Sequence, residues 1–315
     1  MIIASSACST DDRPEGLLGM YVGFDEEQRL VEIEEDLGTP VDLVVTMADS
    51  SSPDAMVSSV WGQFAAPDAY LPTLADRMQV VASVPVAFGP GGTARTAEGR
   101  EEIGANLRAV ADGAHDGEFR LVARYLVEAG YEDAIIRLGH EFDGDWAPYS
   151  ARDNDDAYIA AFRHVHDVMT SVSPEFQFDW TSTLAHFLQH GPPAYPGDDV
   201  VDIVGLDLYW RNSEPMSDEL WQRRFERVLE AHLEFARERG KPVSYPEWGR
   251  ALVDEPGFVE LMHEWFSELP AEGPGSLVYQ AYFNEPGLFD DEFYPYDLEQ
   301  LPNVKTRYVE LFADG

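Results

Sequence analysis

Short apolar runs alternate with longer amphipathic segments along most of the chain. Eight runs are almost continuously apolar, which is typical of strands buried on both faces. They cover residues 17–24, 41–48, 79–87, 133–141, 176–182, 202–209, 242–248 and 277–283. Apolar residues at three- and four-residue spacing predict helices over 119–130, 155–170, 217–240, 258–269 and 304–312.

Eight strands, each followed by a helix or a looped crossover, predict a single α/β domain folded as a (β/α)8 TIM barrel. The barrel is expected to occupy residues 16–315, and no composition break marks a linker within it. The glycine-rich segment 88–93 is expected to be a loop after the third strand, on the face that carries the active site.

Residues 1–15 are predicted to be a disordered tail or the remnant of a lipoprotein-type signal. Small residues precede Cys8 and polar residues follow it, as at the end of such a signal. This predicts an extracellular or cell-surface lipoprotein, with a cytoplasmic protein as the alternative. Cys8 is the one cysteine, so no internal disulfide can form.

The composition adds a large negative charge. Asp and Glu number 59 against 21 Lys and Arg, a net charge of −38. Such a surface repels phosphate backbones, so no nucleic-acid partner is expected. The charge suits either solubility or adaptation to high salt, where screening weakens self-repulsion. No apolar run reaches the ~20 residues that span a bilayer. The oligomeric state stays open, with a monomer as the working expectation.

Barrel enzymes carry their catalytic groups at the C-terminal ends of strands, and here those ends combine carboxylates with aromatic rings. Glu141 ends the fourth strand and Glu247 lies in the seventh, with Asp207 and Tyr209 in the sixth. Trp180, Trp248 and Phe283 end other strands and are expected to line the site.

Aromatic rings and carboxylates together suit a sugar. The apolar faces of a sugar ring stack on aromatic side chains. Glycosidic bond cleavage needs one carboxyl to protonate the leaving oxygen and a second to attack or activate water. Glu141 and Glu247 are expected to face each other across the barrel. Tyr209 is placed to donate a hydrogen bond to Glu247, and Arg137 to hold its charge from below.

Two segments carry a resemblance to a known family. Arg137-Leu138-Gly139-His140-Glu141-Phe142-Asp143-Gly144-Asp145-Trp146 resembles the Arg-x-x-His-Glu-x-Asn-Gly-x-Trp signature of glycoside hydrolase family 26, the β-mannanase family of a large retaining (β/α)8 clan. Pro246-Glu247-Trp248-Gly249 is similar to the segment around that family's nucleophile.

The resemblance implies Glu141 as acid/base and Glu247 as nucleophile of a retaining glycoside hydrolase. It implies that Arg137, His140, Trp146 and Tyr209 support the sugar, and that a polysaccharide is the partner, with no metal or organic cofactor. This sequence departs from the pattern at Asp143, after Trp146 and at Tyr282-Phe283. β-Mannan is the default substrate that the resemblance implies. The departures leave β-1,3-xylan, mixed-linkage glucan or another glycan open.

Other interpretations remain. A carbohydrate-binding barrel without turnover, or a barrel enzyme that cleaves by elimination, would keep the aromatic cleft. His140-Glu141 lacks the second histidine of a zinc protease motif, since position 144 is glycine. His186 and His190 have metal-binding spacing but no evident third ligand. The acidic cluster Asp290, Asp291 and Glu292 is expected to be a solvated loop.

Overall fold

The computed structural model describes residues 14–23, 27–289 and 292–313. Eight parallel strands close into a barrel in chain order, so each strand pairs with its neighbour in sequence and β1 pairs with β8. The strands are β1 (Leu17–Tyr21), β2 (Leu43–Met47), β3 (Gln79–Val84), β4 (Ile135–Leu138), β5 (Gln177–Thr183), β6 (Ile203–Trp210), β7 (Val243–Arg250) and β8 (Leu277–Phe283).

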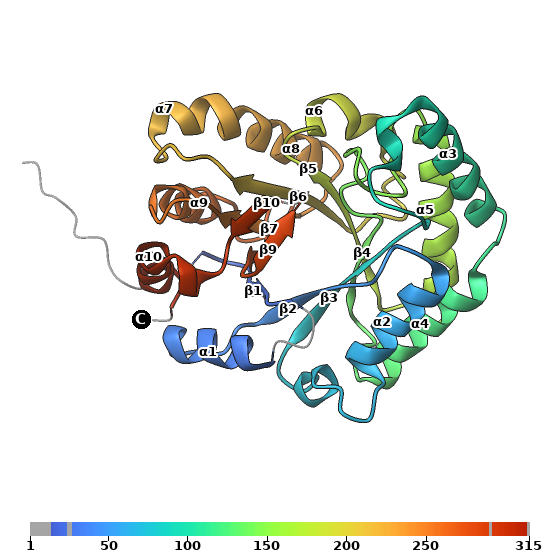
Figure 1. The fold of residues 1–315 in the computed structure, drawn as a ribbon, viewed down its shortest axis with the longest axis horizontal. Helices are drawn as coiled ribbons and strands as arrows, with labels where there is room; N and C mark the ends of the chain where they lie inside the picture. The colour runs from blue at the N-terminus through green and yellow to red at the C-terminus, as the bar shows by residue number, and fades with distance from the viewer. Residues whose placement is uncertain (1–13, 24–26, 290–291, 314–315) are drawn as a thin grey trace, which may run out of the picture.

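Helices surround this barrel on its outside (Figure 1). They are α1 (Glu27–Leu37), α2 (Pro53–Phe64), α3 (Ala97–Ala111), α4 (Asp116–Glu128), α5 (Asp155–Thr170), α6 (Phe187–His190), α7 (Asp218–Trp221), α8 (Arg227–Glu238), α9 (Gly257–Ser267) and α10 (Pro302–Phe312). The predicted single-domain (β/α)8 barrel is therefore confirmed. No helix in the described ranges has the length and apolar character needed to cross a bilayer.

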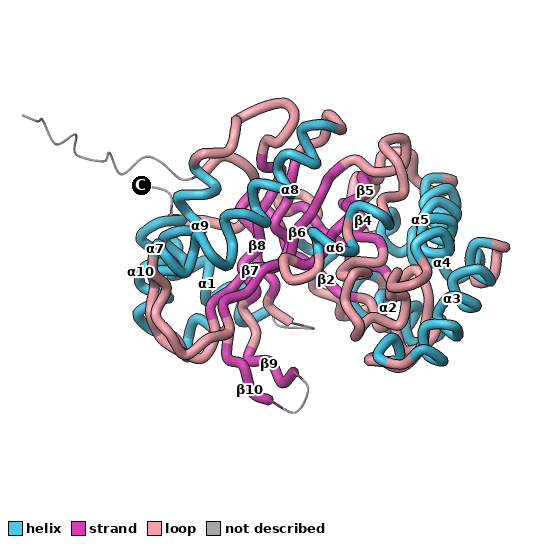
Figure 2. The backbone as a smooth tube through the Cα atoms, turned by 90° about the horizontal axis from the view of Figure 1, so that it is seen from above, coloured by secondary structure: helices cyan, strands magenta, loops and turns pink. Residues whose placement is uncertain are grey.

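A short antiparallel pair follows the last barrel strand. β9 (Pro286–Phe289) pairs with β10 (Glu292–Pro295). Figure 2 shows this pair set apart from the barrel strands, with helices flanking the barrel on either side. Two predictions lie outside the described residues: the signal remnant around Cys8, and the part of the acidic cluster formed by Asp290 and Asp291.

The core has two parts, because barrel strands are buried on both faces. The larger part lies between the strands and the helices and includes Leu138, Trp180 and Trp248. The smaller part fills the barrel interior, with Val81, Ile135, Ile203, Tyr279 and Ala281 among its members.

Polar groups share that interior. Asp179 is fully buried and accepts hydrogen bonds from Thr181 (2.7 Å), Ser244 (2.6 Å) and Tyr279 (2.7 Å). A buried carboxylate needs such partners to offset its lost hydration. This hydrogen-bonded floor lies below the strand ends that carry the candidate site.

Strand β7 contains a bulge. Tyr245 pairs with Gln280 of β8 and Trp248 pairs with Tyr282, so three steps along β7 match two along β8. The side chain of Ser244 faces the barrel interior, where it donates to Asp179, and the ring of Tyr245 packs outside on Phe266. Strict alternation would then turn Glu247 outward. The extra residue returns it to the interior.

Candidate active site

Glu141 follows β4 in an unusual backbone conformation. Gly139 and Glu141 both have positive φ values, 58° and 52°. The left-handed region costs a residue with a side chain about 1–2 kcal/mol. The Glu141 amide donates to the carbonyl of Thr181 at 2.9 Å, which fixes the turn against β5. Strain of this kind persists where surrounding contacts over-determine it, often at active sites.

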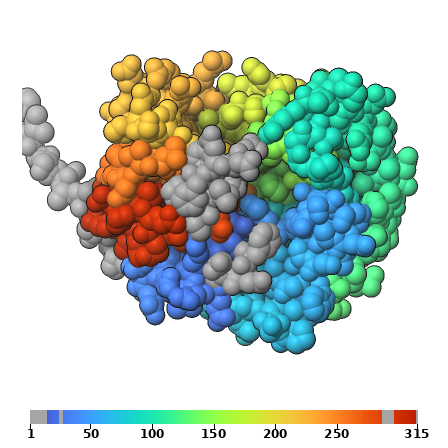
Figure 3. Space-filling view, in the orientation of Figure 1, coloured from blue at the N-terminus to red at the C-terminus, as the bar shows by residue number. Residues whose placement is uncertain are grey.

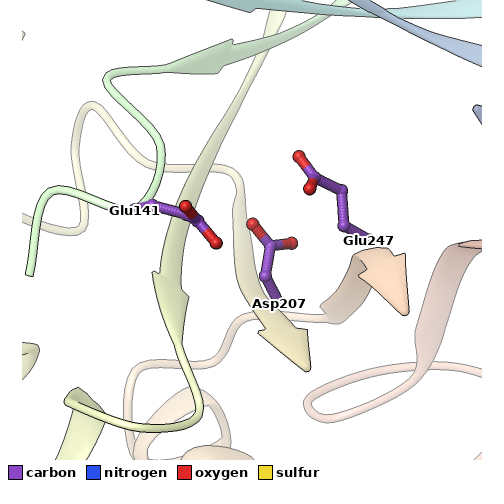
Figure 4. A group of neighbouring side chains, drawn as sticks. All are labelled: Glu141, Asp207 and Glu247. Carbon is purple, nitrogen blue, oxygen red and sulfur yellow. The ribbon is translucent and has the colours of Figure 1, made fainter. Parts of the chain in front are cut away.

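Three carboxylates converge at the strand ends. Glu141 comes from the loop after β4, Asp207 from β6 and Glu247 from β7 (Figure 4). One oxygen from each carboxylate lies within 4.8 Å of the others. The bulge in β7 and the turn after β4 therefore bring together the two glutamates that the sequence predicted to face each other.

Arg137 lies among these acids with no exposed surface. Its guanidinium forms ion pairs with Asp207 and Glu247 and hydrogen bonds with Thr181 (3.2 Å) and Ser83 (3.3 Å). The predicted contact between Arg137 and Glu247 is confirmed. Bidentate donors make arginine well suited to hold two carboxylates in fixed positions.

Tyr209 makes the second predicted contact. Its hydroxyl donates to Glu247 Oε2 at 2.5 Å. Glu247 thus accepts from a cation on one oxygen and from a phenol on the other, and both contacts stabilise its ionised form. The guanidinium of Arg211 lies 4.5 Å from the centre of the Tyr209 ring, a cation–π distance.

Glu141 has the opposite environment. Burial, and then the charge of Glu247, raise the pKa of the Glu141 carboxyl to about 7, while Arg137, Trp146 and Arg211 oppose the rise. Its main hydrogen bond comes from Trp146, whose Nε1 donates to Oε2 at 2.6 Å. Near neutral pH this carboxyl can therefore carry a proton and release it, whereas the oxygens of Glu247 accept from Arg137 and Tyr209.

Asp207 was placed at this strand end by the sequence, but no role was predicted for it. One of its oxygens pairs with Arg137, and Oδ1 is buried without a hydrogen-bond partner in the described part of the chain. Burial raises the pKa of Asp207 well above its ordinary value, with Glu247 and Glu141 adding to the rise and Arg137 opposing it. The sequence pattern that could have indicated a role for Asp207 is the spacing Asp-x-Tyr at the end of β6, which places it two residues before Tyr209.

Two cavities meet at Glu141 and Trp146. The larger, of about 450 Å³, is lined by both glutamates, Asp207, Tyr209 and Arg211 among others. The smaller, of about 210 Å³, includes His140 and residues from the ends of β2 and β3. Figure 3 shows the face above the barrel hollowed near its centre, where green segments lie deeper than the teal and blue ones around them. Trp146 lines both cavities and is 37% exposed, so its ring is available to a ligand.

His140 lines the smaller cavity together with Glu141. The hydroxyl of Tyr149 is 3.4 Å from its Nδ1. Burial, followed by the charge of Arg137, lowers the pKa of His140 well below its ordinary value, so the ring is neutral near pH 7. A neutral imidazole can donate or accept one hydrogen bond without adding charge next to Glu141. Its predicted contact with sugar stays a prediction.

Two predicted substrate contacts are wrong. Trp180 and Trp248 have no exposed surface, because they lie on the outward-facing positions of β5 and β7. Trp180 stacks on Phe142 at 4.9 Å, and Trp248 packs on Tyr282 at 5.1 Å while its Nε1 donates to Gln280 at 2.5 Å. Both rings belong to the core between strands and helices.

Phe283 lies in the barrel interior and is 4% exposed. Its ring stacks on Tyr21 at 4.6 Å and meets Tyr209 edge-on at 5.6 Å. It therefore supports the ring that donates to Glu247, and its own contact with substrate stays a prediction.

The carboxylates are the one group in the described residues whose geometry could hold a metal ion. Arg137 already neutralises two of the three, so a cation would have to displace or approach a buried guanidinium. His186 and His190 have ring centres 6.3 Å apart and form no such group within the described ranges.

This geometry can now be compared with known proteins. Residues 96–235 match the family described as Glycosyl hydrolase family 26. The resemblance seen in the sequence is confirmed for this part of the chain. The matched segment includes Glu141 and Tyr209 but ends before Glu247, so the second glutamate depends on the geometry above.

Relatives with curated names agree with that match. Endoglucanase H of Acetivibrio thermocellus is 33% identical over 131 residues, covering 38% of this chain and 14% of its own length. Mannan endo-1,4-beta-mannosidase of Bifidobacterium adolescentis is 27% identical over 181 residues, covering 51% of this chain and 17% of its own length. The chain thus spans less than a fifth of the length of either relative.

Solved structures share the fold. The catalytic domain of the endo-beta-1,4-mannanase from Bacillus sp. JAMB-750 aligns with a TM-score of 0.63 and 17% identity, covering 95% of this chain and 90% of that one. At this identity the likeness supports the barrel architecture.

Proposed function

We propose that this barrel is a retaining glycoside hydrolase that cleaves a β-linked polysaccharide. The observation that carries the proposal is the approach of Glu141 and Glu247, whose nearest oxygens lie within 4.8 Å. Retaining enzymes hold their two carboxyl groups ~5–5.5 Å apart, whereas inverting enzymes leave ~6.5–9.5 Å for a water molecule.

The environments of the two glutamates support their division of labour. Glu247, ionised and held by Arg137 and Tyr209, attacks the anomeric carbon. Glu141, with its raised pKa, donates its proton to the glycosidic oxygen as that bond breaks. The ionised Glu141 then takes a proton from water, which attacks the glycosyl-enzyme ester and releases the sugar with its configuration retained.

We propose β-1,4-mannan as the substrate and endo cleavage as the mode of action. The names of the mannosidase and mannanase relatives support the sugar. The two cavities support endo action, because both border Glu141 and Trp146, so a glycan chain has space on either side of the acid. β-1,3-Xylan and mixed-linkage glucan are the competing substrates in the same assay.

Replacing Glu247 with Ala tests the mechanism. We expect loss of turnover on mannan with an unchanged circular dichroism spectrum. Added azide should partly restore cleavage, because azide fills the place of the lost nucleophile. The product should then be a mannosyl azide of inverted configuration. Glu230→Ala, on an exposed position of α8, is the control and should keep full activity.

Full activity in the Glu247→Ala variant would exclude the assignment. A wild-type protein that binds mannan but releases no product would indicate a carbohydrate-binding barrel. An unsaturated product would indicate elimination.

A further inference from the structure

A hydrogen-bonded chain leads from a buried acid to the edge of the cleft. Asp143 has no exposed surface. Its two oxygens accept from the Thr183 amide at 3.1 and 3.0 Å, and Oδ2 is 3.2 Å from the Thr183 hydroxyl. That hydroxyl is also 3.1 Å from Nδ1 of His186. Asp143, Thr183 and His186 therefore form a three-residue relay.

The Thr183 hydroxyl has one proton, so it donates one hydrogen bond, and donation along the relay can point in only one direction at a time. An ionised Asp143 can only accept, which makes the hydroxyl donate to it. The hydroxyl must then accept from His186, so Nδ1 carries the ring proton and Nε2 is a bare acceptor. A protonated Asp143 donates to the hydroxyl instead, the hydroxyl donates to Nδ1, and the proton moves to Nε2.

His186 reaches the site next to the acid. Its ring centre is 5.6 Å from that of Trp146, whose Nε1 donates to Glu141. Thr183, Leu184 and Ala185, the residues just before it, line the larger cavity. Nε2 has no partner in the described ranges and is not a buried atom, so it faces solvent at the cleft edge.

We propose that Asp143 acts through Thr183 to fix the tautomer of His186, which then offers Nε2 as a hydrogen-bond acceptor to a sugar hydroxyl bound against Trp146. Asp143 is a positioning residue in this scheme and His186 determines specificity. The contact with sugar rests on the proposed function, whereas the tautomer does not.

The charges around the relay give it a pH dependence. Burial is the main cause that raises the pKa of Asp143 to about 7, and the charge of Glu141 adds to it. Burial lowers the pKa of His186, so its ring stays neutral while Asp143 titrates. The titratable groups that face the relay are Glu141, Asp145, Arg152, Tyr158 and His190.

Nitrogen NMR of histidine-labelled protein reads the tautomer directly. In the wild type we expect the His186 proton on Nδ1 at about pH 8.5 and on Nε2 at about pH 6. Asp143→Asn should keep it on Nε2 at both values, because the amide donates to Thr183 as a protonated acid would. The His186→Gln spectrum assigns the signal. The same tautomer in the wild type and in Asp143→Asn at about pH 8.5 would overturn the relay.

Thr183 offers a matched pair of variants. Thr183→Ser keeps the hydroxyl and should behave as the wild type. Thr183→Val removes it, and the tautomer should then no longer change with pH between about 6 and 8.5. A pH-dependent change that persists in Thr183→Val would show that Asp143 does not act through this hydroxyl.

Calorimetry with mannohexaose tests the contact, in a Glu247→Gln background that does not turn the sugar over. Loss of one hydrogen bond should weaken binding roughly threefold to tenfold. We expect this loss for both His186→Phe and Asp143→Asn at about pH 8.5, and for neither at about pH 6, where Nε2 of the wild type carries the proton and cannot accept. Equal affinities at about pH 8.5 would overturn the contact. No binding by any variant would count against the proposed function, while the NMR result still decides the relay.

Discussion

The chemistry of individual residues depends on which partner each carboxylate has. Glu247 receives two donors, Arg137 and Tyr209, whereas Glu141 receives one neutral donor and faces another carboxylate. Two glutamates whose nearest oxygens lie within 4.8 Å of each other therefore have different electrostatic environments. The activity should follow the protonation of Glu141.

A first prediction concerns Arg211, which opposes the raised pKa of Glu141. Arg211→Met removes a positive charge, so the pKa should rise further above about 7. The alkaline limb of the kcat/KM profile, where Glu141 loses its proton, should move to higher pH. Arg223→Met, on an exposed position, is the control. A limb that moves to lower pH would contradict the role of Arg211.

A second prediction concerns Arg137. Arg137→Met leaves Asp207 and Glu247 buried without their cation, and breaking such a pair costs about 3–5 kcal/mol. Denaturant unfolding should show that loss. Arg77→Met removes an ion pair with Glu34 at a partly exposed site, where about 1 kcal/mol or less is expected. Similar losses in both variants would mean that Arg137 does not compensate the buried acids.

The approach of Glu141 and Glu247 could be predicted from sequence because each glutamate ends an apolar run and the motif around Glu141 is fairly specific. The errors at Trp180 and Trp248 have a physical cause. Strands of this barrel are apolar on both faces, so the sequence carries no alternation that tells inside from outside. The bulge in β7 makes it still harder to predict from sequence which face its side chains occupy. Arg211 carried no pattern of its own beyond being a rare cation in an acidic chain.

At the scale of elements, all eight barrel strands were predicted, and α5 spans the same residues 155–170 as its prediction. The helices α1, α2 and α3 were not predicted individually. α3 buries Ile103, Leu107 and Val110 but carries several charges and six alanine or glycine residues, so its face has few large apolar side chains. β9 and β10 form a separate two-stranded sheet in the described part of the chain, and the apolar pattern of the barrel strands does not predict them.

A third prediction concerns the turn after β4. Gly139 has φ 58°, and a Cβ there would lie 2.8 Å from Val86 and 3.1 Å from Tyr158. Gly139→Ala should therefore combine backbone strain with a clash, destabilise by roughly 2–3 kcal/mol and lower kcat by shifting Glu141. Gly38→Ala, at φ 70° with nothing within 4 Å, has the strain without the clash. Equal unfolding free energies for the two variants would contradict the crowding at β4.

At the scale of the whole molecule, the net charge of −38 acts on the folded state as self-repulsion. The ion pairs seen at the surface, such as Arg163 with Asp199 and Lys305 with Asp36, engage a small part of the acidic excess. Screening should therefore stabilise the fold.

A fourth prediction follows for salt. The thermal midpoint should rise between about 0.05 and 1 M KCl, where the screening length falls from over 10 Å to ~3 Å. Scanning calorimetry measures it, and the same series in a variant with several surface Glu replaced by Gln should show a smaller rise. A midpoint that falls with KCl would contradict repulsion as the main effect of this charge.

The bulge in β7 has a consequence for anyone who redesigns or aligns this chain. It adds one residue between Tyr245 and Trp248 relative to β8, so the spacing of a regular strand does not predict which way Glu247 faces. Deleting Pro246 removes that extra residue. Regular alternation from Ser244 then places Glu247 in the interior and keeps Trp248 opposite Tyr282, so a one-residue gap before Glu247 in an alignment still preserves the direction of this glutamate.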